Sequence, residues 1–190
     1  VEDAALLTPY CAVITNPGAD SRKGEIIAMK SYIKEFYYDI EEIKHPGTVE
    51  AGDIMMVGDH YYIGLSGRTN LNGATQLISI LNKYGMTGST VELKKVLHLK
   101  TGMSYLENNN LLLCGEFLSD PRFNKFNIIE IPEEESYAAN CVWINDKVLI
   151  PSGYPKSKQK IIDAGYEIIE LEMSEFRKLD GGLSCLSLRF

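Results

Sequence analysis

An internal repeat is the feature that most constrains what this chain folds into. Two short apolar segments, a helical pattern and a further apolar segment recur at intervals of about 40 to 50 residues. Each copy has the pattern of a β-hairpin followed by a helix and a third strand. The repeat predicts an α/β protein built from successive ββαβ-like repeats.

Four copies can be delimited. The first has a hairpin at 1–14, a helix opened by Asp20 or Ser21, and a strand at 40–43, and the second has a hairpin at 53–65, a helix at 72–84 and a strand at 90–93. The third has strands at 103–106 and 111–114, a helix-poor loop, and a strand at 127–131. The fourth has strands at 139–144 and 148–150, a helix at 157–163 and a strand at 166–171. The first helix is expected to gather its apolar side chains on one side, namely Ile26, Ile27, Met29, Ile33 and Phe36.

A lone strand is expected after the fourth copy, at residues 184–189. A fifth repeat divided between the two ends would pair this strand with one upstream of Val1 and close a ring, as propellers close. The apolar start at Val1 indicates that the chain begins inside a domain and lacks about one repeat. We therefore expect one domain over residues 1–190 with an incomplete first repeat.

Charge and hydropathy exclude several classes of function. The 190 residues carry 19 basic and 26 acidic side chains, a net charge of −7, so no basic surface is expected for nucleic acid or anionic lipid. No apolar run approaches the roughly 20 residues of a membrane-spanning helix, and no secretory signal opens the chain. We expect a cytoplasmic protein.

The cysteines give no metal or disulfide framework. Cys11, Cys114, Cys141 and Cys185 lie far apart without a CxxC pair. Three of them sit among apolar residues of expected strands, where a thiol usually packs and is inert. Cys185 differs because Gly181-Gly182 precede it and permit a close approach of the backbone to a ligand, which favours a nucleophile over a packing residue.

Two further residues occupy the same edge of their own repeats. His98 lies between an expected strand and the next hairpin, and its imidazole can exchange a proton near neutral pH. Glu50 lies at the corresponding edge of the second repeat and is a candidate to orient that imidazole, although a glutamate is more often simply solvated. Together with Cys185 they indicate an acid, an acid/base and a nucleophile at one mouth.

Charged residues near these positions indicate the substrate. Glu2 and Asp3 would make the mouth negative, which suits a cationic electrophile. Arg22 and Arg68 precede helices, and a guanidinium binds a carboxylate through two hydrogen bonds, although either arginine alone is more often a solvated surface residue. The combination predicts a small substrate with a cationic end and a carboxylate end, namely an amino acid with a guanidinium side chain.

Seven stretches resemble the dimethylarginine dimethylaminohydrolase family across essentially the whole chain. They are VED at 1–3, GADSRKGE at 18–25, TVEAGD at 48–53, GRTN at 67–70, LHLKTG at 97–102, AANC at 138–141 and GGLSCLSLRF at 181–190. The resemblance implies the pentein fold of the guanidine-modifying enzymes, a propeller of five ββαβ-like repeats. It also implies that the opening strand, a mobile loop over the substrate and a further acid of the family precede Val1.

The resemblance implies a role for each candidate residue. Cys185 would attack the guanidinium carbon, His98 would act as general acid/base, and Glu50 would be its associated acid. Substrate contacts are implied for Glu2, Asp3, Arg22, Arg68 and the backbone around Leu179. The implied products are citrulline and dimethylamine, formed through a thiouronium adduct with neither a metal nor an organic cofactor, in arginine metabolism and nitric oxide regulation.

Alternatives stay open at this point. An arginine deiminase would use the same thiol chemistry on unmethylated arginine, and an inactive relative would only bind arginine-like ligands or a partner protein. Zinc captured by Cys185 and His98 would be inhibitory, because two such ligands with one carboxylate fall short of a closed structural site. Exposed edges of an incomplete ring would favour a homodimer.

Overall fold

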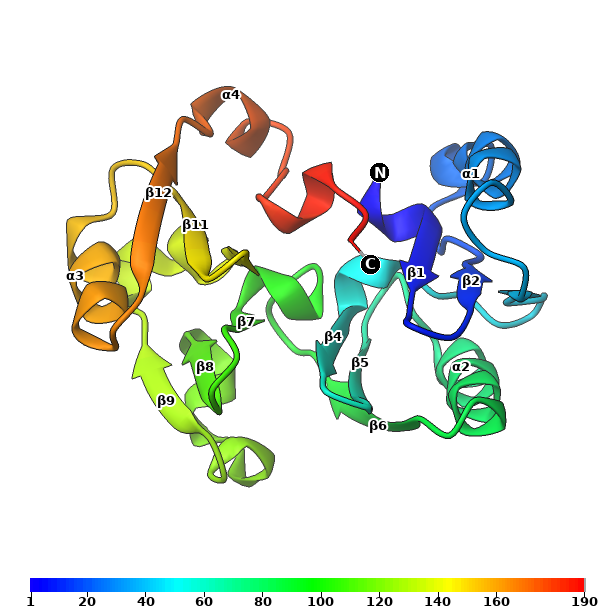
Figure 1. Cartoon of the computed structure of the whole chain (residues 1–190), viewed down its shortest axis with the longest axis horizontal. Coiled ribbons are helices and arrows are strands. Elements are labelled where there is room, and N and C mark those ends of the chain that lie inside the picture. Colours follow the sequence, from blue (N-terminus) through cyan, green and yellow to red (C-terminus); the bar gives the residue numbers. More distant parts are fainter. Residues whose placement is uncertain (190) are drawn as a thin grey trace. The chain divides into compact units, whose positions relative to one another are not determined.

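The computed structural model describes residues 1–189, which contain four three-stranded sheets (Figure 1). In each sheet the first two strands are antiparallel and the third is parallel to the second. The parallel strand requires a crossover, because two parallel neighbours cannot be joined by a tight turn. The four predicted repeats are therefore confirmed.

The elements follow the repeats in chain order. The strands are β1 (Ala5–Leu7), β2 (Ala12–Ile14), β3 (Ile40–Glu42), β4 (Ile54–Val57), β5 (His60–Leu65), β6 (Thr87–Glu92), β7 (Met103–Tyr105), β8 (Asn110–Leu113), β9 (Asn127–Glu130), β10 (Val142–Ile144), β11 (Lys147–Pro151) and β12 (Glu167–Leu171). The α-helices are α1 (Glu25–Ile33), α2 (Leu71–Lys83), α3 (Pro155–Asp163) and α4 (Ser174–Arg177).

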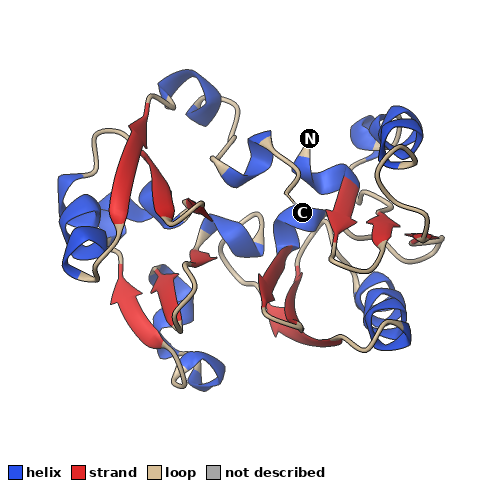
Figure 2. Cartoon of the chain, in the orientation of Figure 1, coloured by secondary structure: helices blue, strands red, loops and turns tan. Residues whose placement is uncertain are grey.

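The crossovers differ among the repeats (Figure 2). Helices α1, α2 and α3 bridge three of them, and the third uses the 3-10 helices Gly115–Ser119 and Pro121–Phe123, as the helix-poor pattern predicts. Pro121 lacks a backbone N–H, and the Asp120 side chain caps the second 3-10 helix by accepting from the Arg122 N–H at 3.0 Å. A longer α-helix is thus interrupted between residues 119 and 121.

Helix α2 lies against the backbone that leads into Glu50. Asn70 caps it by accepting a hydrogen bond from the Gly73 N–H at 2.8 Å, and Leu77 and Leu81 are fully buried. A Cβ on Gly73 would lie 2.1 Å from the Thr48 carbonyl oxygen, so only glycine permits this approach. The packing of α2 therefore fixes the segment that carries Glu50.

Helix α1 buries a narrower face than expected. Ile33 is buried and Ile26 and Met29 pack against the same cluster, whereas Ile27 is 77% exposed and Phe36 lies beyond the helix end and is also exposed. Residues 26, 29 and 33 share one helical face, and residue 27 is turned about 100° from it. The expectation of one continuous apolar side is wrong for Ile27 and Phe36.

The lone strand expected at residues 184–189 is also wrong. Ser184–Leu186 form a 3-10 helix, closed by hydrogen bonds from the Cys185 N–H to the Gly182 carbonyl and from the Leu186 N–H to the Leu183 carbonyl. A strand requires a neighbour to complete its hydrogen bonds, and no strand among residues 1–189 pairs with this segment. Its backbone uses local bonds instead.

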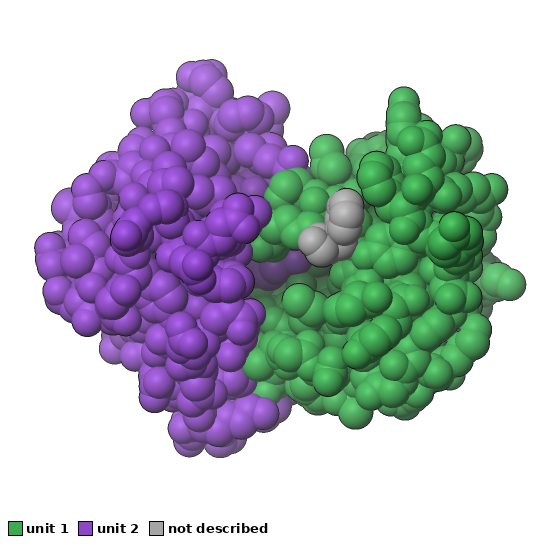
Figure 3. All heavy atoms as spheres, in the orientation of Figure 1, with its two compact units in different colours: residues 1–99, 187–190 green, residues 100–186 purple. Residues whose placement is uncertain are grey.

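The chain divides into two compact units (Figure 3). The first contains residues 1–99 and the last described residues, and its main core packs α2 on its sheets through Tyr61, Ile63, Leu77 and Leu81. The second contains residues 100–186, with a core around Leu112, Val148, Ile150 and Ile161. Among residues 1–189, no helix combines the length and the apolar character needed to cross a bilayer.

Candidate functional site

His98 and Glu50 form a buried pair in the first unit. The His98 Nε2 donates to Glu50 Oε2 at 2.8 Å, since an ionised carboxylate only accepts. The Glu50 side chain is 1% exposed and the His98 side chain 12% exposed. The predicted association of this acid with this imidazole is therefore present.

Glu50 is held from both its backbone and its side chain. Its N–H donates to Thr69 Oγ1 at 3.0 Å, and its Oε1 accepts from the Ala19 N–H at 3.1 Å. Glu50 follows Val49, which forms an isolated bridge with Asn16. Loops from the first and second repeats thus fix the carboxylate that faces His98.

Asp3 lies beside the same pair. Its Oδ1 accepts from the Gly52 N–H at 2.7 Å, and its Oδ2 forms an ion pair with the Arg22 guanidinium. A Cβ on Gly52 would lie 2.8 Å from Asp3 Oδ1 and 3.0 Å from His98 Cγ. Gly52 is therefore the position where the absence of a side chain lets an acid and an imidazole approach one backbone turn.

The remaining predicted residues of the first unit are Arg68 and Glu2. Arg68 is partly exposed, and its Nη1 lies 3.9 Å from Glu50 Oε1. Its loop is held because Ser66 Oγ accepts from the N–H groups of Arg68 and Thr69 at 3.0 and 3.1 Å. Glu2 is buried in a 3-10 helix with Asp3.

Asp53 belongs to this cluster although its sequence position indicates only the start of a hairpin. It is fully buried, and its carboxylate accepts from Ser66 Oγ at 2.7 Å and from the Leu99 N–H at 3.0 Å. One bond reaches the loop of Arg68 and the other reaches the residue after His98. The spacing Glu50-Ala51-Gly52-Asp53, which puts a second acid one short turn away, is the only sequence signal for this role.

The electrostatics follow from burial and from partners. Burial by itself would lower the pKa of His98, but the hydrogen bond to Glu50 and the charges of Asp3 and Asp53 outweigh it and raise this pKa above its ordinary value. Burial would raise the pKa of Glu50, yet the hydrogen bonds from His98 and Ala19 hold it below its ordinary value. The pair therefore favours an imidazolium beside a carboxylate.

The other two acids diverge. Burial would raise the pKa of Asp3, but His98, the Gly52 N–H and Arg22 together lower it. For Asp53 burial prevails and its pKa is raised despite His98 and its hydrogen bonds. Two carboxylates at similar depth are thus set to different proton affinities by their partners.

A cation could be held by this cluster. One ligand atom each from Asp3, Glu50 and His98 lies within 4.8 Å of the others. Two carboxylates and an imidazole form a donor set that divalent metals accept. Each of these side chains also has an ion pair or hydrogen bond with another side chain of the protein.

Cys185 lies in the second unit, at the 3-10 helix Ser184–Leu186. It is a partly exposed thiol that is not in a disulfide, whereas Cys11, Cys114 and Cys141 are buried. The Gly182 N–H lies 3.4 Å from Cys185 Sγ as a donor. Leu179 is also in this unit and is 86% exposed. The convergence of Cys185 with His98 and Glu50 stays a prediction.

Known proteins match this fold closely. Residues 22–148 match the family model described as arginine deiminase. The dimethylarginine dimethylaminohydrolase of Pseudomonas aeruginosa is 61% identical over 191 residues, which cover 100% of this chain and 75% of the relative. The chain belongs to the dimethylarginine dimethylaminohydrolase family.

Two solved structures of the family extend the match. The P. aeruginosa dimethylarginine dimethylaminohydrolase, in a cysteine-to-serine variant complexed with citrulline, superposes with a TM-score of 0.98 at 60% identity, over 100% of this chain and 74% of that one. A histidine-to-glycine variant of a dimethylarginine dimethylaminohydrolase, solved as an adduct with S-methyl-L-thiocitrulline, superposes with a TM-score of 0.98 at 60% identity. The match covers 100% of this chain and 75% of that one. The expected pentein fold is confirmed.

Proposed function

We propose that this protein hydrolyses asymmetrically N-methylated arginine to citrulline and dimethylamine. One observation carries the proposal, namely the 61% identity to a dimethylarginine dimethylaminohydrolase across the full length of this chain. The protein is accordingly a hydrolase that acts on a carbon–nitrogen bond.

We assign the nucleophile to Cys185. Its thiolate adds to the guanidinium carbon and forms a carbon–sulfur bond, and the tetrahedral carbon then expels dimethylamine. The leaving nitrogen takes its proton from His98, which becomes neutral. A relative's adduct with a thiocitrulline supports covalent chemistry of this kind in the family.

We assign the second half of the reaction to the same imidazole. Neutral His98 removes a proton from water, the water oxygen attacks the thiouronium carbon, and the carbon–sulfur bond breaks to release citrulline and the thiolate. One water is consumed, its second proton leaves with the amine as dimethylammonium, and both the thiolate and the imidazolium are restored. The partner of His98, Glu50, supports this role because it stabilises the protonated form that starts the cycle.

The acids of the first unit support a cationic substrate. Asp3 and Glu50 are buried, and both titrate below their ordinary pKa values because positive groups and N–H donors offset their burial. Asp3 binds a guanidinium in this structure, that of Arg22. A carboxylate that pairs with one guanidinium is chemically suited to hold the substrate's nitrogens, which we propose for Asp3 and Glu2. Arg22, Arg68 and the backbone at Leu179 are proposed to hold the amino-acid end.

A product assay tests the proposal. The chain is incubated with asymmetric dimethylarginine, and citrulline and dimethylamine are measured together with the mass of any adduct on Cys185. We expect equal amounts of both products, and their loss in Cys185→Ala but not in the matched Cys114→Ala variant, whose thiol is buried. Full activity of Cys185→Ala would overturn the assignment.

Arginine deiminase activity is the second candidate, because the arginine deiminase family model matches residues 22–148. The thiol chemistry would be the same, and ammonia would leave in place of dimethylamine. Parallel incubations with arginine and with asymmetric dimethylarginine at equal concentration distinguish the two. Faster release of citrulline from arginine would establish the deiminase.

We further propose that residues of both units serve one catalytic domain, since His98 and Cys185 belong to different units. A cytoplasmic location is supported by four cysteines that are not in disulfides, which suits a reducing compartment. A homodimer is supported by the unpaired outer edges of strands such as β3 and β12, which light scattering on the purified protein tests. Removal of methylated arginine would connect the protein with nitric oxide regulation.

A further inference from the structure

One short segment of the second unit holds the loop that carries Cys185 through hydrogen bonds. The loop follows α4 and is the red segment there in Figure 1. The segment that holds it is the end of the 3-10 helix Glu133–Ala139 together with Asn140. On the N-terminal side of Cys185, the Tyr137 hydroxyl donates to the Gly181 carbonyl at 2.6 Å.

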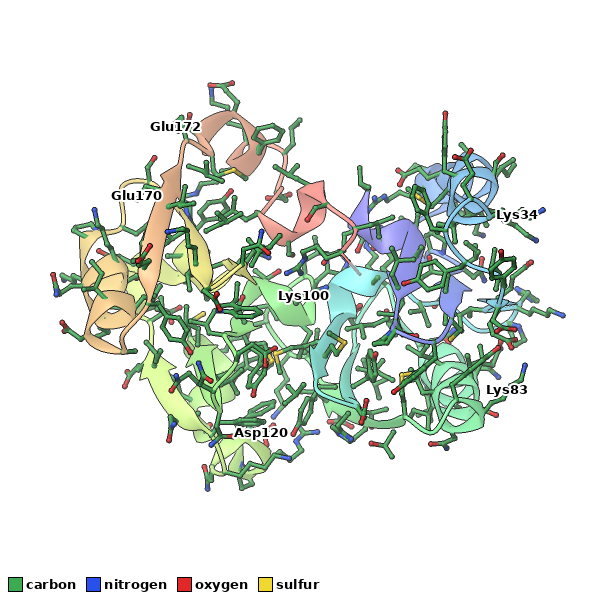
Figure 4. All side chains as sticks on the ribbon, viewed as in Figure 1. Lys34, Lys83, Lys100, Asp120, Glu170 and Glu172 are labelled. Carbon is green, nitrogen blue, oxygen red and sulfur yellow. The ribbon has the colours of Figure 1, made fainter. Side chains whose placement is uncertain are left out.

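Asn140 makes the second contact, through two hydrogen bonds to Ser184. Its Oδ1 accepts from the Ser184 N–H at 2.9 Å, and its Nδ2 donates to Ser184 Oγ at 3.0 Å. The same Nδ2 donates to the Lys100 carbonyl at 2.9 Å, and Figure 4 labels Lys100 at the start of the second unit. The Asn140 amide therefore links Ser184, the residue before Cys185, to the backbone at Lys100.

This contact is buried and closely packed. Asn140 is 8% exposed and Ser184 is 2% exposed, so water does not readily replace either bond. A Cβ on Gly182 would lie 2.6 Å from Asn140 Cγ. Glycine at this position lets the loop lie directly on the Asn140 amide.

The packing reaches the sulfur through the backbone. The Cys185 N–H donates to the Gly182 carbonyl at 3.2 Å, and the Gly182 N–H faces Cys185 Sγ at 3.4 Å. Gly182, which contacts the thiol, and Ser184, which precedes it in the chain, are thus the residues that lie against Asn140. Any shift of Ser184 moves the sulfur with it.

We propose that Asn140 is a positioning residue for the nucleophile, which holds the Cys185 thiol at its reacting position through Ser184 and Gly182. The proposal rests on the assignment of Cys185 as nucleophile. Asn140 does not touch the reacting atoms, so its loss is expected to change the rate of attack rather than substrate binding. Displacement of a reacting group by about 1 Å can lower a rate by about a hundredfold.

The test compares Asn140→Ala with Asn110→Ala. Asn110 is a matched control because its Nδ2 also makes a side-chain hydrogen bond in the second unit, to the Tyr166 hydroxyl at 2.7 Å, away from the loop. We expect kcat to fall at least about tenfold in Asn140→Ala with KM within about threefold of the parent, and neither to change in Asn110→Ala. Thermal midpoints of both variants separate this effect from unfolding.

A second measurement does not depend on turnover. The rate of Cys185 alkylation by iodoacetamide, followed by mass spectrometry across pH, reports the position and environment of the thiol directly. We expect a slower rate and a displaced pH profile in Asn140→Ala, and the parent profile in Asn110→Ala. Unchanged alkylation and kcat in Asn140→Ala would overturn the proposal.

A milder variant covers the case in which Asn140→Ala does not fold. Ser184→Ala keeps the N–H bond to Asn140 Oδ1 and removes only the Oγ acceptor. We expect a reduction of a few fold in the alkylation rate of Cys185, and an unchanged rate would count against the positioning role of Asn140. If the parent releases no citrulline, the proposed function fails, while the alkylation comparison still decides the role of Asn140.

Discussion

His98 Nε2 lies 2.8 Å from Glu50 Oε2 inside the first unit, and the carboxylate raises the pKa of the imidazole that it contacts. The ordinary value of 6.5 for histidine would leave most of the population neutral at pH 7.5. With Glu50 in place, a larger fraction of His98 is protonated, which suits its proposed role as proton donor to the leaving amine.

Replacement of Glu50 by glutamine tests this relationship. Glu50→Gln removes the negative charge and keeps the shape, so the pKa of His98 falls and the alkaline limb of kcat shifts to lower pH. We expect kcat at pH 7.5 to fall about tenfold or more. Glu35→Gln, on the exposed end of the first crossover, is the control and should keep the parent profile. An unmoved alkaline limb in Glu50→Gln would separate the two residues functionally.

Gly52 tests how closely the site is packed. In Gly52→Ala the new methyl would meet Asp3 Oδ1 at 2.8 Å and His98 Cγ at 3.0 Å. We expect a loss of about 1–3 kcal/mol in the free energy of unfolding, and a lower kcat because Asp3 and His98 must move. Gly24→Ala, where no atom lies within 4 Å of the added Cβ, should change kcat little. Equal kcat values in Gly52→Ala and Gly24→Ala would show that Asp3 and His98 can move without an effect on catalysis.

Asp53 tests the link between His98 and the loop of Arg68. Asp53→Ala leaves the Leu99 N–H and the Ser66 hydroxyl without their buried acceptor. We expect the free energy of unfolding, measured in urea at pH 7, to fall by about 2–4 kcal/mol. Asp163→Ala at the exposed end of α3 should change it by less than about 0.5 kcal/mol. A small loss in Asp53→Ala would mean that water replaces the carboxylate.

The pKa shifts also set a pH dependence of stability. The raised pKa of His98 adds stability that is fully present below pH 6.5 and is lost as pH rises through the folded pKa. The lowered pKa of Glu50 adds stability that is present above pH 4.5 and is lost as pH falls through the folded pKa. The difference in unfolding free energy between parent and Glu50→Gln should therefore be greatest between these two pH values. A difference that does not vary with pH would contradict the shifts.

Asp53 contributes with the opposite sign to Glu50. Its pKa is raised by burial, so its contribution is present at low pH and is lost as pH rises through the folded pKa. Asp53→Asn, which removes the charge, should therefore gain stability relative to the parent as pH increases. Urea unfolding of both proteins at a series of pH values from about 4 upward measures this, and a relative loss of stability in Asp53→Asn as pH rises would refute it.

The repeats were predictable from the sequence because hairpins and crossovers impose periods that apolar residues report directly. The turns Gly58-Asp59 and Asn145-Asp146 lie at positive φ at three of these four positions and at the ends of the expected strands. The pairing of Glu50 with His98 was predictable from their equivalent places in two repeats. These features depend on local pattern and on repetition.

Other features depend on partners distant in sequence. The strand expected at residues 184–189 fails because strand formation requires a neighbour, which no local pattern reveals. The roles of Asp53 and Asn140 arise from hydrogen bonds to Leu99 and Ser184, 46 and 44 residues away. The short spacing from Glu50 is the one sequence signal for Asp53, and no local pattern marks Asn140 as buried rather than solvated.

The ion pair between Arg22 and Asp3 has a consequence for affinity. A tethered guanidinium competes with a cationic ligand for the Asp3 carboxylate, at an effective concentration set by a chain of 19 residues. With Asp3 as the proposed holder of the substrate's nitrogens, binding would exchange one cation for another, and the observed dissociation constant would exceed the value expected without the Arg22–Asp3 ion pair. A ligand that also offers a carboxylate to the displaced Arg22 guanidinium would regain this lost affinity.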